Sequence, residues 1–484
     1  MIRREEINQI SKIDEKILDM LNQLPQNYWD FKDSDTSELV HGIHSYPAMM
    51  IYPISRNLIE IVKSNKEITS LLDPFAGSGT VLVEAMLADI PEIYGNDLNP
   101  LARLVSKVKT TILDIDLLQE TFKNIAQNID RLYKKYKKFI TIIDDYMINK
   151  KELDITAKTG WGNNAPQYLE EFFQKNSLNL RTPNFYNLGF WFKPRVIFEL
   201  QLIKNVINTI DDKDIKDFYL IAFSETIRLV SNKRNGEFKM YRMQADKILS
   251  FNPDVKNTFF AQVEKCIQKE KEFIENLNLA NLPHVKIVNN NAKELEDIPD
   301  NSIDLIITSP PYGDSKTTVA YGEFSRLSLQ WLNLENLSEE NIRAIDKNLM
   351  GGIKLKNQPD NIIHSNTFHN SFHKIKETDE KRAYDVYSFY YDLEKVIETL
   401  SKKMKMDGYQ FWVVGNRTVR DENLKTDIII REIAKEYGMT YLCTIDRNIL
   451  NKVLPSKNSP TNQAGKTVST MVNEHIVVLK KNGN

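Results

Sequence analysis

The stretch ITSLLDPFAGSGT, from Ile68 to Thr80, decides the fold class. A short apolar run at 68–72 ends in an aspartate and a loop with two glycines, and the apolar segment 81–87 predicts a helix packed on a sheet. A second strand is predicted at 92–95, leading to Asp97. Strand, helix and strand in this order form a βαβ unit, the building block of parallel α/β sheets.

The glycine loop predicts a site for an anionic group, because the start of a helix presents unpaired backbone N–H groups. A P-loop requires Lys and then Ser or Thr after its last glycine, but Gly79 is followed by Thr80 and Val81. A dinucleotide loop has a third glycine where this chain has Leu82. Asp97 is placed to bind a ribose diol. A ligand with one carboxylate and an adenosine, such as S-adenosylmethionine, fits this pattern; the alternative is a tight structural turn.

A second motif, TSPPY at 308–312, ends the strand predicted at 303–308. Its two prolines fix the backbone and remove its donors, so Ser309 offers a hydroxyl, Pro310 a carbonyl and Tyr312 an aromatic ring. The exocyclic amine of a nucleobase is a poor nucleophile, because its lone pair is delocalised into the ring. We expect Ser309 and the Pro310 carbonyl to accept its hydrogens, which turns the lone pair toward a sulfonium methyl, while Tyr312 stacks on the base. The alternative is a proline strand terminator followed by an unrelated tyrosine.

The segments DPFAGSGT at 73–80 and TSPPY at 308–312 resemble the cofactor and catalytic motifs of the amino-group DNA methyltransferases. Serine in the first catalytic position resembles the N4-cytosine members, whereas Asn or Asp is usual in the N6-adenine members. The resemblance covers about 41–100 and 285–480 and is specific at the two motifs. It implies an α/β fold, with a Rossmann-like S-adenosylmethionine-dependent methyltransferase sheet and a large helical insertion.

The resemblance also implies roles for single residues. The loop at 73–79 is expected to line the methionine pocket, Asp97 to bind the ribose, and Asn291 to lie where an adenine contact, more often Asp, is usual. The segment HGIHSYPAMMIYP at 41–53 resembles the one that closes over the methionine end. The candidate cofactor-binding residues are Tyr46, Asp73, Phe75, Ala76, Gly77, Gly79, Thr80, Asp97 and Asn291, and the candidate catalytic residues are Ser309, Pro310, Pro311 and Tyr312.

The predicted function is direct methyl transfer from S-adenosylmethionine to the N4 amine of a flipped cytosine in double-stranded DNA. A C5-cytosine enzyme attacks through a cysteine in a Pro-Cys pair, and neither Cys266 nor Cys443 follows a proline, so both are expected in the core. The alternatives are an N6-adenine DNA methyltransferase, an RNA exocyclic-amine methyltransferase and a catalytically silent DNA-recognition subunit. Family analogy alone adds a restriction-modification system with a cognate restriction endonuclease.

The rest of the chain is predicted to be organised around these motifs. Residues 101–280 are mostly helical and too long for a sheet crossover, so they predict an inserted helical domain. The full division is a helical lead-in at 1–40, a catalytic domain at 41–100 and 281–484 with further strands at 285–288, 409–414, 440–445 and 475–479, and a second insertion at 335–385. Because the cofactor motif precedes the catalytic motif, target recognition is expected in one of the two insertions.

The segment 231–242 is the candidate nucleic-acid contact. Its basic residues outnumber Glu237 and alternate with Phe238 and Tyr241, a pattern that suits a phosphate backbone and unstacked bases. A solvated loop between helices is an equal alternative. The run at 131–138 is instead typical of an amphipathic helix. The candidate DNA-binding residues are Lys233, Arg234, Lys239 and Arg242.

Composition excludes several classes of protein. A net charge of -2 over 484 residues excludes binding of nucleic acid by bulk positive charge. No apolar run approaches the roughly 20 residues of a membrane span. Two cysteines exclude a disulfide framework and a thiolate zinc site, and the histidines at 364, 369 and 373 lack metal-ligand spacing. We therefore expect a cytoplasmic protein without membrane or metal partners.

Overall fold

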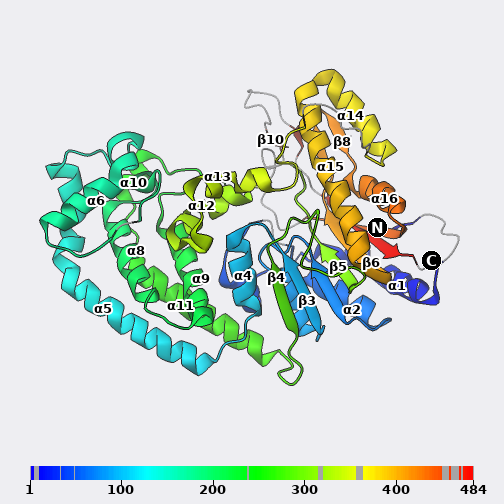
Figure 1. Cartoon of the computed structure of the whole chain (residues 1–484), viewed down its shortest axis with the longest axis horizontal. Helices are drawn as coiled ribbons and strands as arrows, with labels where there is room; N and C mark the ends of the chain where they lie inside the picture. Colours follow the sequence, from blue (N-terminus) through cyan, green and yellow to red (C-terminus); the bar gives the residue numbers. More distant parts are fainter. Residues whose placement is uncertain are drawn as a thin grey trace.

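The computed structural model describes residues 2–4, 10–32, 34–47, 50–181, 183–236, 239–313, 320–355, 363–449, 457–458, 468–469 and 473–482. Figure 1 shows two parts: a sheet covered by helices, which carries both chain ends, and a lobe of helices from the cyan and green part of the chain. The predicted α/β class with a large helical insertion is confirmed.

The central sheet has the strand order β1-β9-β12-β6-β5-β2-β3-β4. Its strands are β1 (Ile2–Arg3), β2 (Ser70–Asp73), β3 (Glu92–Asn96), β4 (His284–Val288), β5 (Ile303–Thr308), β6 (Met404–Val414), β9 (Met439–Asn448) and β12 (Asn473–Lys481). The neighbouring strands β6, β5, β2, β3 and β4 are parallel to one another, and β12 runs antiparallel to both β6 and β9. Two small hairpins pair β7 (Arg417–Val419) with β8 (Glu422–Leu424), and β10 (Lys457–Asn458) with β11 (Val468–Ser469).

The order of the parallel strands creates a switch point. The chain runs outward from β2 through β3 to β4 and then returns to the other side of β2 at β5. Crossovers therefore leave β2 and β5 in opposite directions, which opens a crevice at their carboxyl ends. Open α/β sheets bind ligands at such a crevice. The glycine loop follows β2 and the segment 308–312 ends β5, so both motifs lie at this point.

Helices cover both faces of the sheet. Successive strand residues point to opposite faces, and apolar residues on both faces are buried. Leu71 and Leu305 belong to one core, and Leu72 and Ile306 to the other. The first core includes residues of α1 (Lys12–Gln23), α2 (Tyr52–Lys63), α3 (Thr80–Leu87) and α4 (Pro100–Thr110), and the second those of α14 (Asn366–Thr378), α15 (Glu380–Lys403) and α16 (Thr426–Glu436). The nearly all-apolar sequence of α3 fits its burial against β2 and β3.

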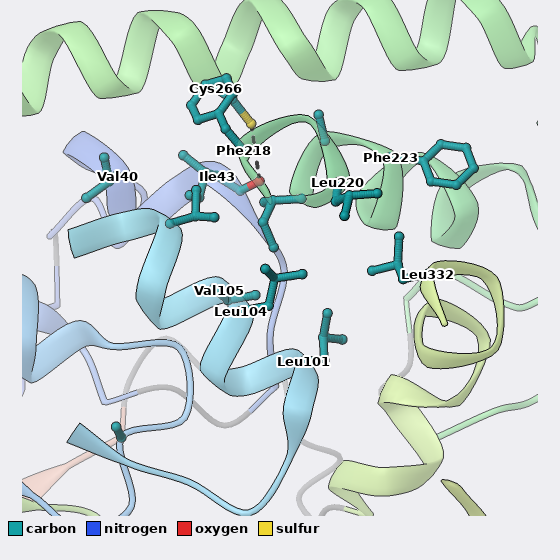
Figure 2. Packing of buried hydrophobic residues seen from close by; sticks show 14 of the residues in the cluster. Val40, Ile43, Leu101, Leu104, Val105, Phe218, Leu220, Phe223, Cys266 and Leu332 are labelled. Carbon is teal, nitrogen blue, oxygen red and sulfur yellow. Dashed lines mark hydrogen bonds between the residues drawn. The ribbon is translucent and has the colours of Figure 1, made fainter. Parts of the chain in front are cut away.

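The helical lobe packs on the sheet region through apolar side chains. Its helices are α5 (Ile115–Asp145), α6 (Asn163–Lys175), α7 (Leu188–Trp191), α8 (Pro194–Ile207), α9 (Lys213–Val230), α10 (Ala245–Ser250) and α11 (Val255–Glu275), with π-helical turns at Tyr146–Lys150 and Lys158–Gly162. Figure 2 shows Phe218 of α9 and Cys266 of α11 facing Ile43 and Val105. Both cysteines are free and buried, as predicted. Two further helices, α12 (Tyr321–Leu332) and α13 (Glu339–Asn348), follow β5.

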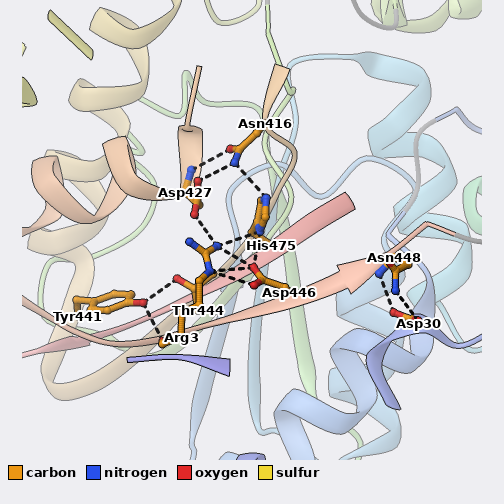
Figure 3. Close-up of polar contacts among 9 residues, drawn as sticks. All are labelled: Arg3, Asp30, Asn416, Asp427, Tyr441, Thr444, Asp446, Asn448 and His475. Carbon is orange, nitrogen blue, oxygen red and sulfur yellow. Dashed lines mark hydrogen bonds and ion pairs between the residues drawn. The ribbon is translucent and has the colours of Figure 1, made fainter. Parts of the chain in front are cut away.

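Short 3-10 turns connect these elements, at Tyr28–Asp30, Leu39–Ile43 and Leu334–Asn336. The chain start differs from the helical lead-in that we expected, because Ile2–Arg3 forms an edge strand on β9. Figure 3 shows how the Arg3 guanidinium is held, at 2.7 Å from both Asp427 and Asp446. A strand of two residues is too short to show a periodic sequence pattern. The ion pairs of Arg3 with Asp427 and Asp446 hold it in place. The loop at 454–466, whose two prolines and Lys457 predict a contact with the substrate strand, lies outside the described residues apart from β10.

Candidate active site

A cavity lies at the switch point between β2 and β5. Its wall contains residues that follow four parallel strands: 73–78 after β2, 96–98 after β3, 291–293 after β4, and Ser309 and Pro311 after β5. The structure brings together ten of the predicted site residues in this wall: Tyr46, Asp73, Phe75, Ala76, Gly77, Thr80, Asp97, Asn291, Ser309 and Pro311. Gly79, Pro310 and Tyr312 are not in the cavity wall.

The loop between β2 and α3 turns at its two glycines. Gly77 and Gly79 have φ angles of +51° and +76°, a left-handed backbone conformation that residues with a side chain rarely adopt. Gly79 also lies against α4, where a Cβ would meet Ser106 at 3.0 Å. The Gly79 N–H donates to the Ala76 carbonyl at 2.7 Å, and Ser106 Oγ donates to the Gly77 carbonyl at 2.9 Å. Gly79 thus shapes the loop from behind, whereas Gly77 faces the cavity.

Asp73 connects the two motifs across neighbouring strands. Thr308 Oγ1 donates to Asp73 Oδ1 at 2.7 Å, and the Phe75 N–H donates to the same oxygen at 3.1 Å. The side chain is 3% exposed. Burial raises the pKa of Asp73 to about 7, because an ionised carboxylate loses its water there. A cationic ligand group beside Asp73 would favour the ionised form.

Asp97 lies at the end of β3, at the opposite side of the glycine loop. Its Oδ2 accepts the Gly77 N–H at 3.0 Å, which fixes the loop against β3. Burial raises the pKa of Asp97, although its backbone hydrogen bonds oppose this rise. Arg103 on α4 donates to the Asp97 carbonyl at 2.7 Å and to Asn289 Oδ1 at 2.8 Å, which holds the ends of β3 and β4 together. Asn291 follows in the same wall.

Tyr46 lies over the glycine loop. Its ring is 3.7 Å from the position that a Cβ on Gly77 would take. The Tyr46 hydroxyl accepts a hydrogen bond from Asn99 Nδ2 at 3.1 Å, and its ring stacks on Tyr321, with centroids 6.2 Å apart. Phe324 meets the ring edge-on at 6.0 Å. The tyrosine is therefore packed by α12 on one side and bonded to the start of α4 on the other.

The segment that carries Tyr46 is anchored to both parts of the molecule. His41 Nε2 lies 2.7 Å from Glu84 Oε1 on α3, and His44 Nε2 lies 2.9 Å from Ser224 Oγ on α9. Burial lowers the pKa of both histidines, to about 4 for His44, so both rings are neutral at pH 7. The segment thus bridges the helix after the glycine loop and the helical lobe.

The segment after β5 places a hydroxyl beside a phenol. Ser309 Oγ donates to the Tyr312 hydroxyl at 3.3 Å, and that hydroxyl donates to Glu474 Oε1 on β12 at 3.0 Å. Glu474 forms an ion pair with Arg447 of β9. Burial raises the pKa of Tyr312 well above its usual value, and the charge of Glu474 raises it further, so the phenol keeps its hydrogen.

The basic segment 231–242, of which residues 237 and 238 lie outside the described part of the chain, contacts α12 through Lys233 and Met240. Lys233 is 2% exposed, and its Nζ lies 5.6 Å from the centre of the Phe324 ring. The Arg242 guanidinium stacks on Phe190 at 4.0 Å and donates to backbone carbonyls at 155 and 156. Lys233 is therefore buried, Arg234 is exposed, and Lys239 and Arg242 are both half-buried, with the Arg242 guanidinium held against Phe190.

His364 and His369 have hydrogen-bond partners within the protein. His364 Nδ1 lies 2.5 Å from Glu394 Oε1, and His369 Nε2 lies 2.8 Å from the Ile363 carbonyl. In the part of the chain that the structure describes, no cluster of three or more His, Cys, Asp or Glu side chains could hold a metal ion. None of the helices within the described residues is both long and apolar enough to cross a bilayer.

Comparison with known proteins gives relatives but no matching family model. The type II methyltransferase M.MvaI of Kocuria varians is 41% identical over 479 residues, which span 97% of this chain and 96% of that protein. The chain belongs to the type II methyltransferases. M.MjaII of Methanocaldococcus jannaschii is 27% identical over 42% of this chain and 43% of its own length, and M.BsoBI of Geobacillus stearothermophilus is 24% identical over 60% and 50%.

Several residues at this candidate site of the type II methyltransferase carry no local sequence signal. Glu474 lies 162 residues beyond Tyr312 in the chain and reaches it only because β12 lies next to β6. Asn99 and Arg103 are polar positions at the start of a helical pattern, and nothing in that pattern indicates their bonds to Tyr46 and Asp97. Thr308 belongs to the TSPPY motif, but its hydrogen bond to Asp73 follows only from the pairing of β2 with β5.

Proposed function

We propose that this type II methyltransferase transfers a methyl group from S-adenosylmethionine to the exocyclic N4 amine of a cytosine flipped out of double-stranded DNA. The observation that carries the proposal is the juxtaposition of the glycine loop and Ser309 in one cavity at the switch point of the sheet. One wall suits an adenosine with a charged tail, and in the other Ser309 presents an acceptor to an amine.

The chemistry of the cavity fits this cofactor. Asp97 is a carboxylate at the end of β3 that can accept hydrogen bonds from ribose hydroxyls. Phe75, Met50 and Val396 give the wall apolar surface for an adenine ring. Asp73 is a buried carboxyl in the cavity wall, and the cationic end of the ligand beside it would favour its ionised form. When bound, S-adenosylmethionine supplies an electrophilic methyl group on a sulfonium.

Ser309 and Pro310 orient the nucleophile in this proposal. The Ser309 oxygen and the Pro310 carbonyl each accept one hydrogen of the amine, so that the nitrogen lone pair faces the cavity. Such orientation can lower a barrier by about 7–11 kcal/mol, whereas flipping a base costs a few kcal/mol. Tyr312 offsets part of that cost by stacking. Since the step is a direct transfer, neither cysteine takes part, in keeping with their burial.

The choice of base and polymer rests on further observations. Serine at position 309, by resemblance to the N4-cytosine enzymes, favours cytosine over adenine. We propose that one of the two insertions, at 101–280 or at 335–385, recognises the DNA site, and that Arg234 and Lys239 contact phosphates. A cognate restriction endonuclease is proposed by analogy with other type II methyltransferases.

Mass spectrometry of nucleosides from duplex DNA, incubated with the purified protein and isotope-labelled S-adenosylmethionine, tests the proposal without knowledge of the recognition site. Labelled N4-methylcytosine is the expected product. Labelled N6-methyladenine would keep the mechanism and correct the base. Label in RNA alone, or no label although the cofactor binds, would contradict the proposal.

A further inference from the structure

The Ser309 hydroxyl is connected to a buried ion pair two strands away. Ser309 Oγ donates to the Tyr312 hydroxyl, which donates to Glu474 Oε1. Glu474 lies on β12, which β6 separates from β5. Its other carboxylate oxygen pairs with Arg447, and the side chains of Glu474 and Arg447 are 10% and 5% exposed. Arg447 Nε donates in turn to the Trp29 carbonyl at 2.8 Å, which fixes the ion pair in place.

The chemistry of this chain of contacts fixes the direction of every hydrogen. A carboxylate paired with an arginine accepts hydrogen bonds and donates none, so the Tyr312 hydroxyl must give its single hydrogen to Glu474. The phenol oxygen is then left as an acceptor, and the Ser309 hydrogen points to it. The remaining direction around Ser309 Oγ therefore presents lone pairs only.

This arrangement matters for an amine substrate. An amine offers hydrogens to the serine, so a serine hydroxyl whose hydrogen pointed at the amine would repel it. We propose that Glu474 is a positioning residue, which holds the Ser309 hydroxyl as an acceptor for the target amine by orienting the Tyr312 hydroxyl. The inference rests on the proposed function and adds to it a determinant outside both motifs.

Glu474→Gln tests the direction of the hydrogens with little change in size. Arg447 can only donate, so the glutamine must turn its oxygen to Arg447 and its NH₂ group to Tyr312. The Tyr312 hydroxyl then accepts from the amide and turns its own hydrogen toward Ser309. The Ser309 hydrogen is displaced toward the amine, and the relay is reversed.

The measurement is the single-turnover rate of methyl transfer from labelled S-adenosylmethionine to duplex DNA, with the affinities for both ligands measured separately. We expect Glu474→Gln to lower the rate about 100-fold, the scale of losing one oriented hydrogen-bonding group at a reacting centre, with both affinities within about twofold of wild type. In a Tyr312→Phe background the relay is absent, so the same substitution should have no further effect. A merely structural role for Glu474 would give losses that multiply.

Asp30→Asn is the matched control. Asp30 is 7% exposed and accepts hydrogen bonds from the backbone and side chain of Asn448 on β9. It is not one of the hydrogen-bonded residues that connect Ser309 to Arg447. We expect wild-type rates from this variant. If Glu474→Gln does not fold, Glu474→Asp keeps the charge beside Arg447 and withdraws it from Tyr312, and should give a comparable loss.

Three results would overturn the inference: a fully active Glu474→Gln protein, an equal loss in the Tyr312→Phe background, or an equal loss in Asp30→Asn. A wild-type protein that labels no DNA would instead contradict the proposed function, and the inference with it. An active wild type with an indifferent Glu474 contradicts the inference alone.

Discussion

Asp73→Asn should make the protein more stable at neutral pH while it weakens the site. The pKa of Asp73 rises from the ordinary 3.8 to about 7 in the folded protein. Between these values the folded protein holds a proton that the unfolded chain has released, so stability falls as the pH rises toward 7 and levels off above it. At about 1.4 kcal/mol per pH unit, this carboxyl removes about 3 kcal/mol of stability between pH 5 and pH 8.

The asparagine has no such dependence, and its amide oxygen can still accept from Thr308 and the Phe75 N–H. Urea unfolding of wild type and Asp73→Asn at pH 5 and at pH 8 gives the free energy of unfolding of each protein. The titration of all other groups cancels in the difference between the two proteins. We expect the advantage of the variant to grow by about 3 kcal/mol over this range. Asp304→Asn is the control, because hydrogen bonds from Lys405 and Thr69 outweigh burial and lower the pKa of Asp304.

Asp304→Asn should be less stable than wild type by an amount that does not change between pH 5 and pH 8, since a carboxyl with a lowered pKa is ionised in both states over that range. An Asp73→Asn advantage that stays constant with pH would contradict the raised pKa, because it would mean that Asp73 is ionised in the folded protein throughout. An advantage that shrinks with rising pH would refute it as well.

Three further predictions concern the proposed reaction. Ser309→Ala should abolish turnover and leave cofactor affinity nearly unchanged in calorimetry; an equal loss of affinity would show that the roles are wrongly assigned. Asp97→Ala should weaken cofactor binding by about 10- to 100-fold, the loss of a charged hydrogen-bond acceptor, and unchanged affinity would place the ribose elsewhere. Arg234→Ala and Lys239→Ala should each reduce the salt dependence of DNA binding by about one ion, whereas Lys134→Ala in the amphipathic helix should not.

The part of the fold nearest the site could be predicted because its signals are local. The run from Ile68 to Asp97 contains a strand, a glycine turn, an apolar helix and a second strand, and the structure has β2, α3 and β3 there. A parallel strand buried on both faces needs a continuous apolar run, so Leu305 to Ile307 also mark β5 from the sequence alone. The order of the motifs in the chain then placed the helical insertion between them.

What could not be predicted depends on contacts between distant segments. Glu474 joins the site only through the antiparallel pairing of β12, and a lone glutamate in a strand has no distinguishing pattern. In the basic segment, composition alone does not distinguish the four cationic side chains. In the structure, Lys233 lies beside the Phe324 ring and Arg242 stacks on Phe190. Side-chain direction in an irregular loop is set by such partners and not by residue type.

The glycine loop and Ser309 are proposed to form one methyl-transfer site. A crystal structure of the protein with S-adenosylhomocysteine and a duplex that contains its recognition site tests this claim most directly. We expect the adenosine beside Asp97 and the target cytosine outside the helix stack, with its N4 about 3 Å from Ser309 Oγ. A cofactor product bound elsewhere, or a target base that remains stacked and out of reach of Ser309, would contradict it.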